Sequence, residues 1–146
     1  MTSISNKKIY IIAEIGVNHN GSVIKAKKMI KMCKQSGADA VKFQTYKANN
    51  IADQLISKAA YQKKDNNFES QYEMLKKYEL TDKDFFELHK YALKLNIDFI
   101  STAADKISLQ FLNHKLKLKT IKIGSSDLTN IQLLINAGRT KRNIII

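Results

Sequence analysis

The sequence contains no proline, a single cysteine and no hydrophobic run long enough to span a bilayer. One cysteine excludes a disulfide framework. Cys33 lies among apolar residues of a predicted helix, so we interpret it as a buried structural thiol rather than a nucleophile. The first eight residues lack the apolar core and the cleavage site of a secretory signal. We therefore expect a cytoplasmic protein with no membrane partner.

The chain is strongly basic, with 25 Lys and Arg residues against 13 Asp and Glu residues and a formal net charge of +12. Such a balance could attract nucleic acid or an anionic metabolite. The lysines, however, are spread over several predicted helices with few aromatic residues among them, which is typical of solvated helix faces. We therefore predict no nucleic-acid partner. The 146 residues, 44% of them hydrophobic, are enough for one compact domain with its own core.

Short apolar strands alternate with amphipathic helices along the chain. Strands are predicted at 9–13, 39–46, 97–103, 120–124 and 142–146, and helices at 22–36, 69–77, 81–96, 107–114 and 130–137. The run 9–13 is almost wholly apolar, which favours a strand covered on both faces. Ser22, Thr81 and Thr129 are predicted helix N-caps, and Gly37 and Gly138 are predicted helix stops.

This alternation predicts an α/β fold of parallel strands joined by right-handed crossovers. It fits the (β/α)8 TIM-barrel type, in which functional groups come from the ends of several strands. A complete barrel needs about 250 residues. We therefore expect only the first half, about four βα units plus a fifth strand.

Polar residues recur at the carboxyl end of each predicted strand, where ligands bind in parallel α/β folds. They are Glu14, then Lys42 and Gln44, then Ser101, Thr102 and Asp105, then Lys122, Ser125 and Asp127. Taken alone, the Asn- and Gly-rich stretch 16–21 could equally be a polar turn without a ligand. The connection 47–80 is long for a strand-to-helix link, which favours a lid or binding loop over a spacer.

Four motifs stand in a characteristic order along the chain. They are AEIGVNHNG at 13–21, VKFQT at 41–45, IST at 100–102 and IKIGSSDLTN at 121–130. In order and spacing they resemble the N-terminal half of the N-acetylneuraminate (sialic acid) synthase family, and 69–75 is similar to the lid region of that family. The resemblance spans residues 1–146 and implies a partial TIM-barrel domain, with the C-terminal antifreeze-like domain of the family absent.

The resemblance implies a transferase of sialic acid biosynthesis. Such an enzyme condenses phosphoenolpyruvate with an N-acetylated hexosamine to form a nonulosonic (sialic-type) acid and releases phosphate. It also implies a divalent metal, Mn²⁺ or Mg²⁺, whose histidine ligands come from later strands that this chain lacks. The sequence does not choose between N-acetylmannosamine and a diacetamido sugar as the acceptor.

Several polar positions match the substrate-binding residues of that family. Lys42 and Lys122 match the lysines that bind phosphoenolpyruvate. Thr102 and Ser125 match positions that hydrogen-bond the same ligand. Gln44 is a further candidate for substrate contact. Cations around a carboxylate and a phosphate are what this chemistry requires.

Two carboxylates are the catalytic candidates implied by the resemblance. Glu14 matches an acidic position on the sugar and aldehyde side, and Asp127 falls where members carry an acidic residue next to the sugar. Asp127 is thus expected to act in acid–base catalysis or in orienting the sugar. As an alternative, Glu14 and Lys42 could form an internal ion pair in a barrel without ligands.

A half barrel leaves sheet edges and an apolar interior exposed, which predicts a homo-oligomer or association with a missing C-terminal half. We expect that the chain alone does not turn over substrate. The alternative class is a non-catalytic half barrel that binds an anionic metabolite or a partner protein. Another phosphoenolpyruvate-condensing aldolase would fit the lysines but matches the 14–21 motif poorly.

Overall fold

Five parallel strands form a single sheet in the computed structural model, which describes residues 9–52 and 70–146. They are β1 (Ile12–Gly16), β2 (Ala40–Thr45), β3 (Asp98–Ala103), β4 (Thr120–Lys122) and β5 (Asn143–Ile145). Their order in the sheet is their order in the chain, and each neighbouring pair is parallel. This stepwise order is that of the first half of a barrel, so the predicted fold class is confirmed.

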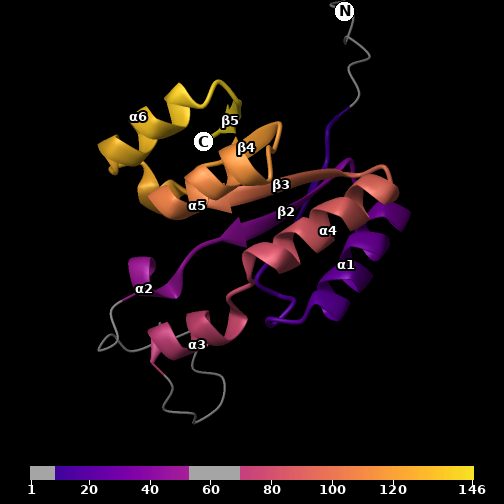
Figure 1. Cartoon of the computed structure of the whole chain (residues 1–146). Coiled ribbons are helices and arrows are strands. Elements are labelled where there is room, and N and C mark those ends of the chain that lie inside the picture. The colour runs from indigo at the N-terminus through magenta and orange to yellow at the C-terminus, as the bar shows by residue number, and fades with distance from the viewer. Residues whose placement is uncertain (1–8, 53–69) are drawn as a thin grey trace, which may run out of the picture.

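Helices connect successive strands (Figure 1). They are α1 (Val23–Gln35), α2 (Ala48–Ile51), α3 (Gln71–Tyr78), α4 (Asp82–Lys94), α5 (Lys106–Gln110) and α6 (Ile131–Arg139). A π-helix, η2 (Phe111–Lys115), continues α5, and a 3-10 turn, η3 (Ser125–Asp127), follows β4. Helices α1 and α4 pack side by side, and α5 packs on α6. Within the described ranges, no helix is both long and apolar enough to cross a membrane.

Most helix ends follow their sequence signals. The Ser22 side chain accepts a hydrogen bond from the amide of Lys25, and Thr81 begins α4 with a reciprocal capping box. Two predictions for α6 are wrong. Asn130 rather than Thr129 caps it, and it continues through Gly138 to Arg139. Adjacent Thr and Asn are both good caps, and a glycine stops a helix only where the chain turns into the left-handed region.

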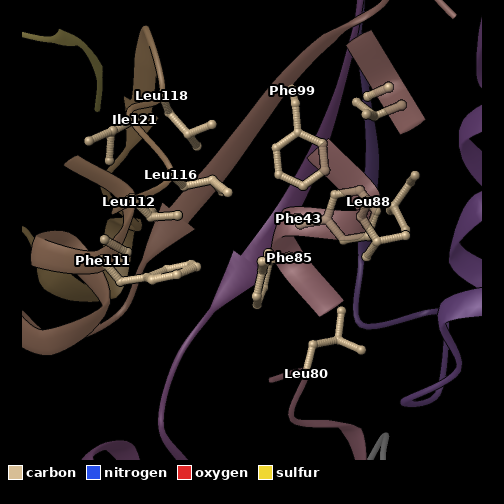
Figure 2. Packing of buried hydrophobic residues seen from close by; sticks show 14 of the residues in the cluster. Phe43, Leu80, Phe85, Leu88, Phe99, Phe111, Leu112, Leu116, Leu118 and Ile121 are labelled. Carbon is tan, nitrogen blue, oxygen red and sulfur yellow. The ribbon is translucent and has the colours of Figure 1, made fainter. Parts of the chain in front are cut away.

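The core lies between the helices and one face of the sheet. Phe43 of β2 and Phe99 of β3 stack with ring centroids 4.9 Å apart, and Figure 2 shows Phe85 and Leu88 of α4 beside them. The rings of Phe85 and Phe111 of η2 meet edge to face with centroids 5.9 Å apart, which connects η2 to α4 in the core. Full burial of each of these side chains contributes roughly 1.5–3 kcal/mol. The alternation of side chains along β2 therefore determines which face of the sheet the helices cover.

The first strand is displaced from its predicted position. Ile9, Tyr10 and Ile11 are 80%, 52% and 54% exposed, so the predicted strand covered on both faces at 9–13 is wrong. The register with β2 begins at Ile12 opposite Ala40, and the carbonyl of Ile11 accepts from the amides of Asp39 and Ala40. An apolar run therefore predicted the strand but not its limits. As a consequence, Glu14 lies within β1 rather than after it.

Candidate active site

The face of the sheet opposite the core carries the predicted polar residues. Residues paired across parallel strands point to the same face. Glu14 pairs with Lys42, Gln44 with Thr102, and Thr102 with Lys122. Because Lys42 and Gln44 are two apart on β2, all five side chains lie on this one face, which would face inward in a closed barrel. We call Glu14, Lys42, Gln44, Thr102 and Lys122 the polar face.

Lys42 is the centre of a hydrogen-bonded group on the polar face. Its Nζ lies 2.5 Å from Glu14 Oε2 and donates to Thr102 Oγ1 at 2.9 Å. The side chain of Lys42 is 14% exposed, so its ammonium needs these partners, whereas that of Glu14 is 49% exposed. The ion pair that the sequence left open as an alternative is therefore present. The Glu14 carboxylate can move into solvent at low cost, whereas the Lys42 ammonium cannot.

A β-bulge at the end of β1 orients the Glu14 side chain toward Gln44. The register with β2 shifts between Glu14 and Gly16, and Gly16 has a φ of +55°. A Cβ atom on Gly16 would lie 3.2 Å from Glu14 Oε1 and 3.7 Å from Gln44 Nε2. The carboxylate and the amide therefore approach the same backbone position, as bulges beside binding sites allow. This places Gln44 next to Glu14 on the polar face.

The end of β4 adds a second cation and a second carboxylate. Lys122 Nζ donates to the carbonyl of Ile123 at 2.5 Å, so this ammonium stays at the carboxyl end of its strand. A Cβ atom on Gly124 would lie 3.2 Å from Asp127 Oδ2 and 3.7 Å from the Thr102 methyl group. Asp127 thus comes to the polar face next to Thr102. Ser125 lies exposed in η3, and no side-chain hydrogen bond ties it to the polar face within the described residues.

Two other residues predicted at the strand ends have structural partners instead. Ser101 points to the opposite face from Thr102, where its hydroxyl lies 2.7 Å from Thr45 Oγ1 in the buried core. Asp105 caps α5 by accepting from the amide of Ser108 at 2.9 Å. The alternation of β3 explains the first result. Of the three polar residues predicted after this strand, Thr102 alone joins the polar face.

His19, from the first motif, is buried beneath the loop after β1. It is 1% exposed, its ring centroid lies 5.9 Å from that of Phe43, and its Nδ1 accepts from the amide of Gly21 at 3.1 Å. Burial lowers its pKa, which keeps the imidazole neutral. The stretch 16–21 is therefore a turn packed on the core, and its histidine does not reach the polar face.

Sequence reasoning missed the contacts that hold α3 at the end of β2. The Tyr46 hydroxyl donates to the carbonyl of Leu75 at 3.0 Å, and the amide of Ala48 donates to Glu79 Oε2 at 3.0 Å. Such pairs join residues about thirty positions apart, and no local pattern indicates them. The long connection 47–80 thus has a fixed frame at both ends. Its part at 53–69, including Glu69 of the predicted lid, lies outside the described residues.

The described residues do not by themselves form a divalent-metal site. No group of three His, Cys, Asp or Glu side chains among them could hold a metal ion. His19 is in the core, and the half-buried His89 packs its ring 5.5 Å from that of Phe99. Glu14 and Asp127 remain as the carboxylates at the polar face. The described residues can supply anion binding through lysines, hydrogen bonding and proton transfer.

Known proteins resemble this chain in sequence. The sequence model of the NeuB family matches residues 29–146. The N,N′-diacetyllegionaminic acid synthase of Legionella pneumophila is 44% identical over 143 residues, which are 97% of this chain and 40% of that protein. The synthase of the same name from Campylobacter jejuni is 46% identical over 141 residues, which are 96% of this chain and 42% of that protein.

A solved structure shows the same fold. The N-acetylneuraminic acid (sialic acid) synthetase of Leptospira borgpetersenii, crystallised in complex with citrate, matches with a TM-score of 0.78 at 29% identity. The match covers 95% of this chain and 44% of that one. The chain therefore spans about two fifths of the length of the proteins that it resembles.

Proposed function

The chain belongs to the NeuB family, and we propose that residues 1–146 supply the N-terminal half of the barrel domain of a nonulosonic-acid synthase. Its relatives are legionaminic acid and sialic acid synthases, which supports a role in carbohydrate biosynthesis of the sialic-acid type. The proposed reaction is the condensation of phosphoenolpyruvate with an N-acetylated aminosugar. A carbon–carbon bond forms and phosphate leaves.

The observation that best supports this proposal is the placement of Lys42, Thr102 and Lys122 on one face of three neighbouring strands, with Lys42 bonded to Thr102. Phosphoenolpyruvate presents a carboxylate and a phosphate, and two ammonium groups with a hydroxyl between them match that pattern of charge. A hydrogen bond to a charged group contributes about 1.5–3 kcal/mol. The partial burial of Lys42 strengthens its attraction for an anion.

Glu14 has a defined role in this proposal. An anion of the substrate takes its place beside Lys42, and the half-exposed carboxylate moves toward the acceptor sugar. Carbon 3 of phosphoenolpyruvate then attacks the aldehyde carbon, and water adds at carbon 2. As phosphate leaves, carbon 2 becomes a ketone. Among the described residues, Glu14 and Asp127 are the carboxylates at the polar face that can accept or return the protons of these steps.

The remaining strands must come from outside residues 1–146 in this proposal. β1 and β5 are the two edges of the sheet, and the unpaired N–H and C=O groups of an edge strand can pair with another strand. We expect either a homo-oligomer or association with a C-terminal half that also carries the metal ligands of the family. The chain alone is expected to bind phosphoenolpyruvate without turnover. The proposal covers both N-acetylmannosamine and a diacetamido sugar as the aminosugar substrate.

A non-catalytic half barrel is the second candidate, and the Glu14–Lys42 ion pair favours it. A pair at 2.5 Å satisfies the buried ammonium without any ligand. This candidate would bind an anionic metabolite at the polar face and perform no condensation.

Reconstitution of the barrel separates the two candidates. The chain would be mixed with the C-terminal remainder of the Campylobacter jejuni relative, and phosphate release and nonulosonic acid formation from phosphoenolpyruvate and each aminosugar would be measured. Product is expected only from the mixture. K42M and K122M should abolish it, whereas K83M, which removes an exposed lysine of α4, should not.

The binding of phosphoenolpyruvate to the chain alone gives a second readout. Binding that K42M removes, without product in any mixture, would favour the non-catalytic half barrel. Unchanged binding in K42M and K122M would contradict both candidates, because both depend on the polar face.

A further inference from the structure

A groove separate from the polar face lies between α5, η2 and α6. Its volume is about 200 Å³, many times the space that one water molecule needs. None of its lining residues belongs to the polar face. The residues whose side chains bear on its chemistry are Lys106, Asn113, His114, Asn136 and Arg139. The π-helix η2 carries two of them, and π-turns recur at functional sites.

The groove is basic. Lys106 and Arg139 are exposed and form no ion pair with any carboxylate in the described part of the chain. The lining contains no Asp or Glu side chain. The carbonyl end of α6 also lies here and repels an anion. Its effect is equivalent to about half a charge, less than the two full charges of Lys106 and Arg139.

The wall of the groove also contains a hydrogen-bond donor without an acceptor. Asn136 Nδ2 is buried and has no partner among the described residues. A buried donor left unpaired costs about 1–3 kcal/mol. Nearby, Arg142 fixes Asn113 by donating to its Oδ1 at 2.8 Å and to its carbonyl at 3.2 Å. The groove therefore offers two cations at its rim and an amide donor in its wall.

We propose that this groove binds a small oxyanion of the phosphate-monoester class. A rotation of the Asn136 side chain lets its buried Nδ2 donate to one oxygen from the wall, and Lys106 and Arg139 hold the charge from the rim. The planar guanidinium of Arg139 can pair with two oxygens of one phosphate group. The volume leaves room for a small organic body attached to the phosphate. The site is distinct from the phosphoenolpyruvate site proposed at the polar face.

Nuclear magnetic resonance of the ¹⁵N-labelled chain tests this site. Inorganic phosphate and glycerol 2-phosphate would be titrated against chloride at matched ionic strength. We expect a saturable shift of the Asn136 side-chain amide, which chloride does not produce. K106Q/R139Q should weaken this binding at least about tenfold. N136D, which places a carboxylate at the donor, should remove saturation.

Two controls make the outcome specific. K90Q/K94Q removes the same charge from exposed positions on α4 and should retain the affinity. K42M changes the polar face and should leave the Asn136 shift intact, so failure of the proposed function would not affect this result. A shift that does not saturate, or equal weakening by K90Q/K94Q, would overturn the proposed site in favour of general attraction to a basic protein.

Discussion

Substitution of Gly21 by alanine should destabilise the fold through a specific contact. Gly21 closes the turn after β1 with a φ of +75°, and a Cβ atom there would lie only 2.6 Å from the carbonyl oxygen of Lys77. Two costs therefore add. The left-handed backbone costs a non-glycine residue about 1–2 kcal/mol. Forcing α3 away from the turn costs a further 1–3 kcal/mol or so, as for other overpacked sites.

Gly37 provides a matched control. Its φ is +86°, but nothing lies within 4 Å of the Cβ that an alanine would add. G37A should therefore show the backbone cost alone, about 1–2 kcal/mol. The difference between the two variants isolates the contact between the first motif and α3.

Urea unfolding followed by far-ultraviolet circular dichroism measures both variants. G21A should lower the free energy of unfolding by about 2–5 kcal/mol with an unchanged dependence on urea. If G21A proves no more destabilising than G37A, the turn does not approach the end of α3.

Three further predictions concern buried polar groups and helix ends. T45V leaves the hydroxyl of Ser101 without its 2.7 Å partner and should cost about 1–3 kcal/mol by urea unfolding; T45V/S101A should recover part of that loss. Burial lowers the pKa of His19 and His89 below the ordinary 6.5, so the unfolded chain binds more protons than the folded chain. The free energy of unfolding should therefore fall as pH drops through and below 6.5. H19Q/H89Q should flatten that pH profile. T81A removes the capping box of α4 and should cost about 1 kcal/mol, seen as a lower thermal midpoint; a midpoint equal to wild type would contradict the capping role.

The sequence alone determined the order of strands and helices and the class of the fold. Apolar runs and helical spacing mark each element, and these are local properties that need no knowledge of neighbours. The same alternation predicted that Lys42 and Gln44 share a face of β2, and their positions confirm it. The motifs that resemble sialic acid synthases also lie in the sequence, and the match to the NeuB family confirms the resemblance.

Tertiary structure decided which polar residues meet. The side chains of Ser101 and Thr102 are neighbours in the sequence, yet one enters the core and the other joins Lys42 on the polar face. The start of β1 depended on where β2 offers a partner, and the position of α3 depended on contacts with residues about thirty positions away. Register and packing join distant parts of the chain, so no local pattern encodes them. The sequence thus named the chemical groups, and only folding brought an ammonium, a hydroxyl and a carboxylate together.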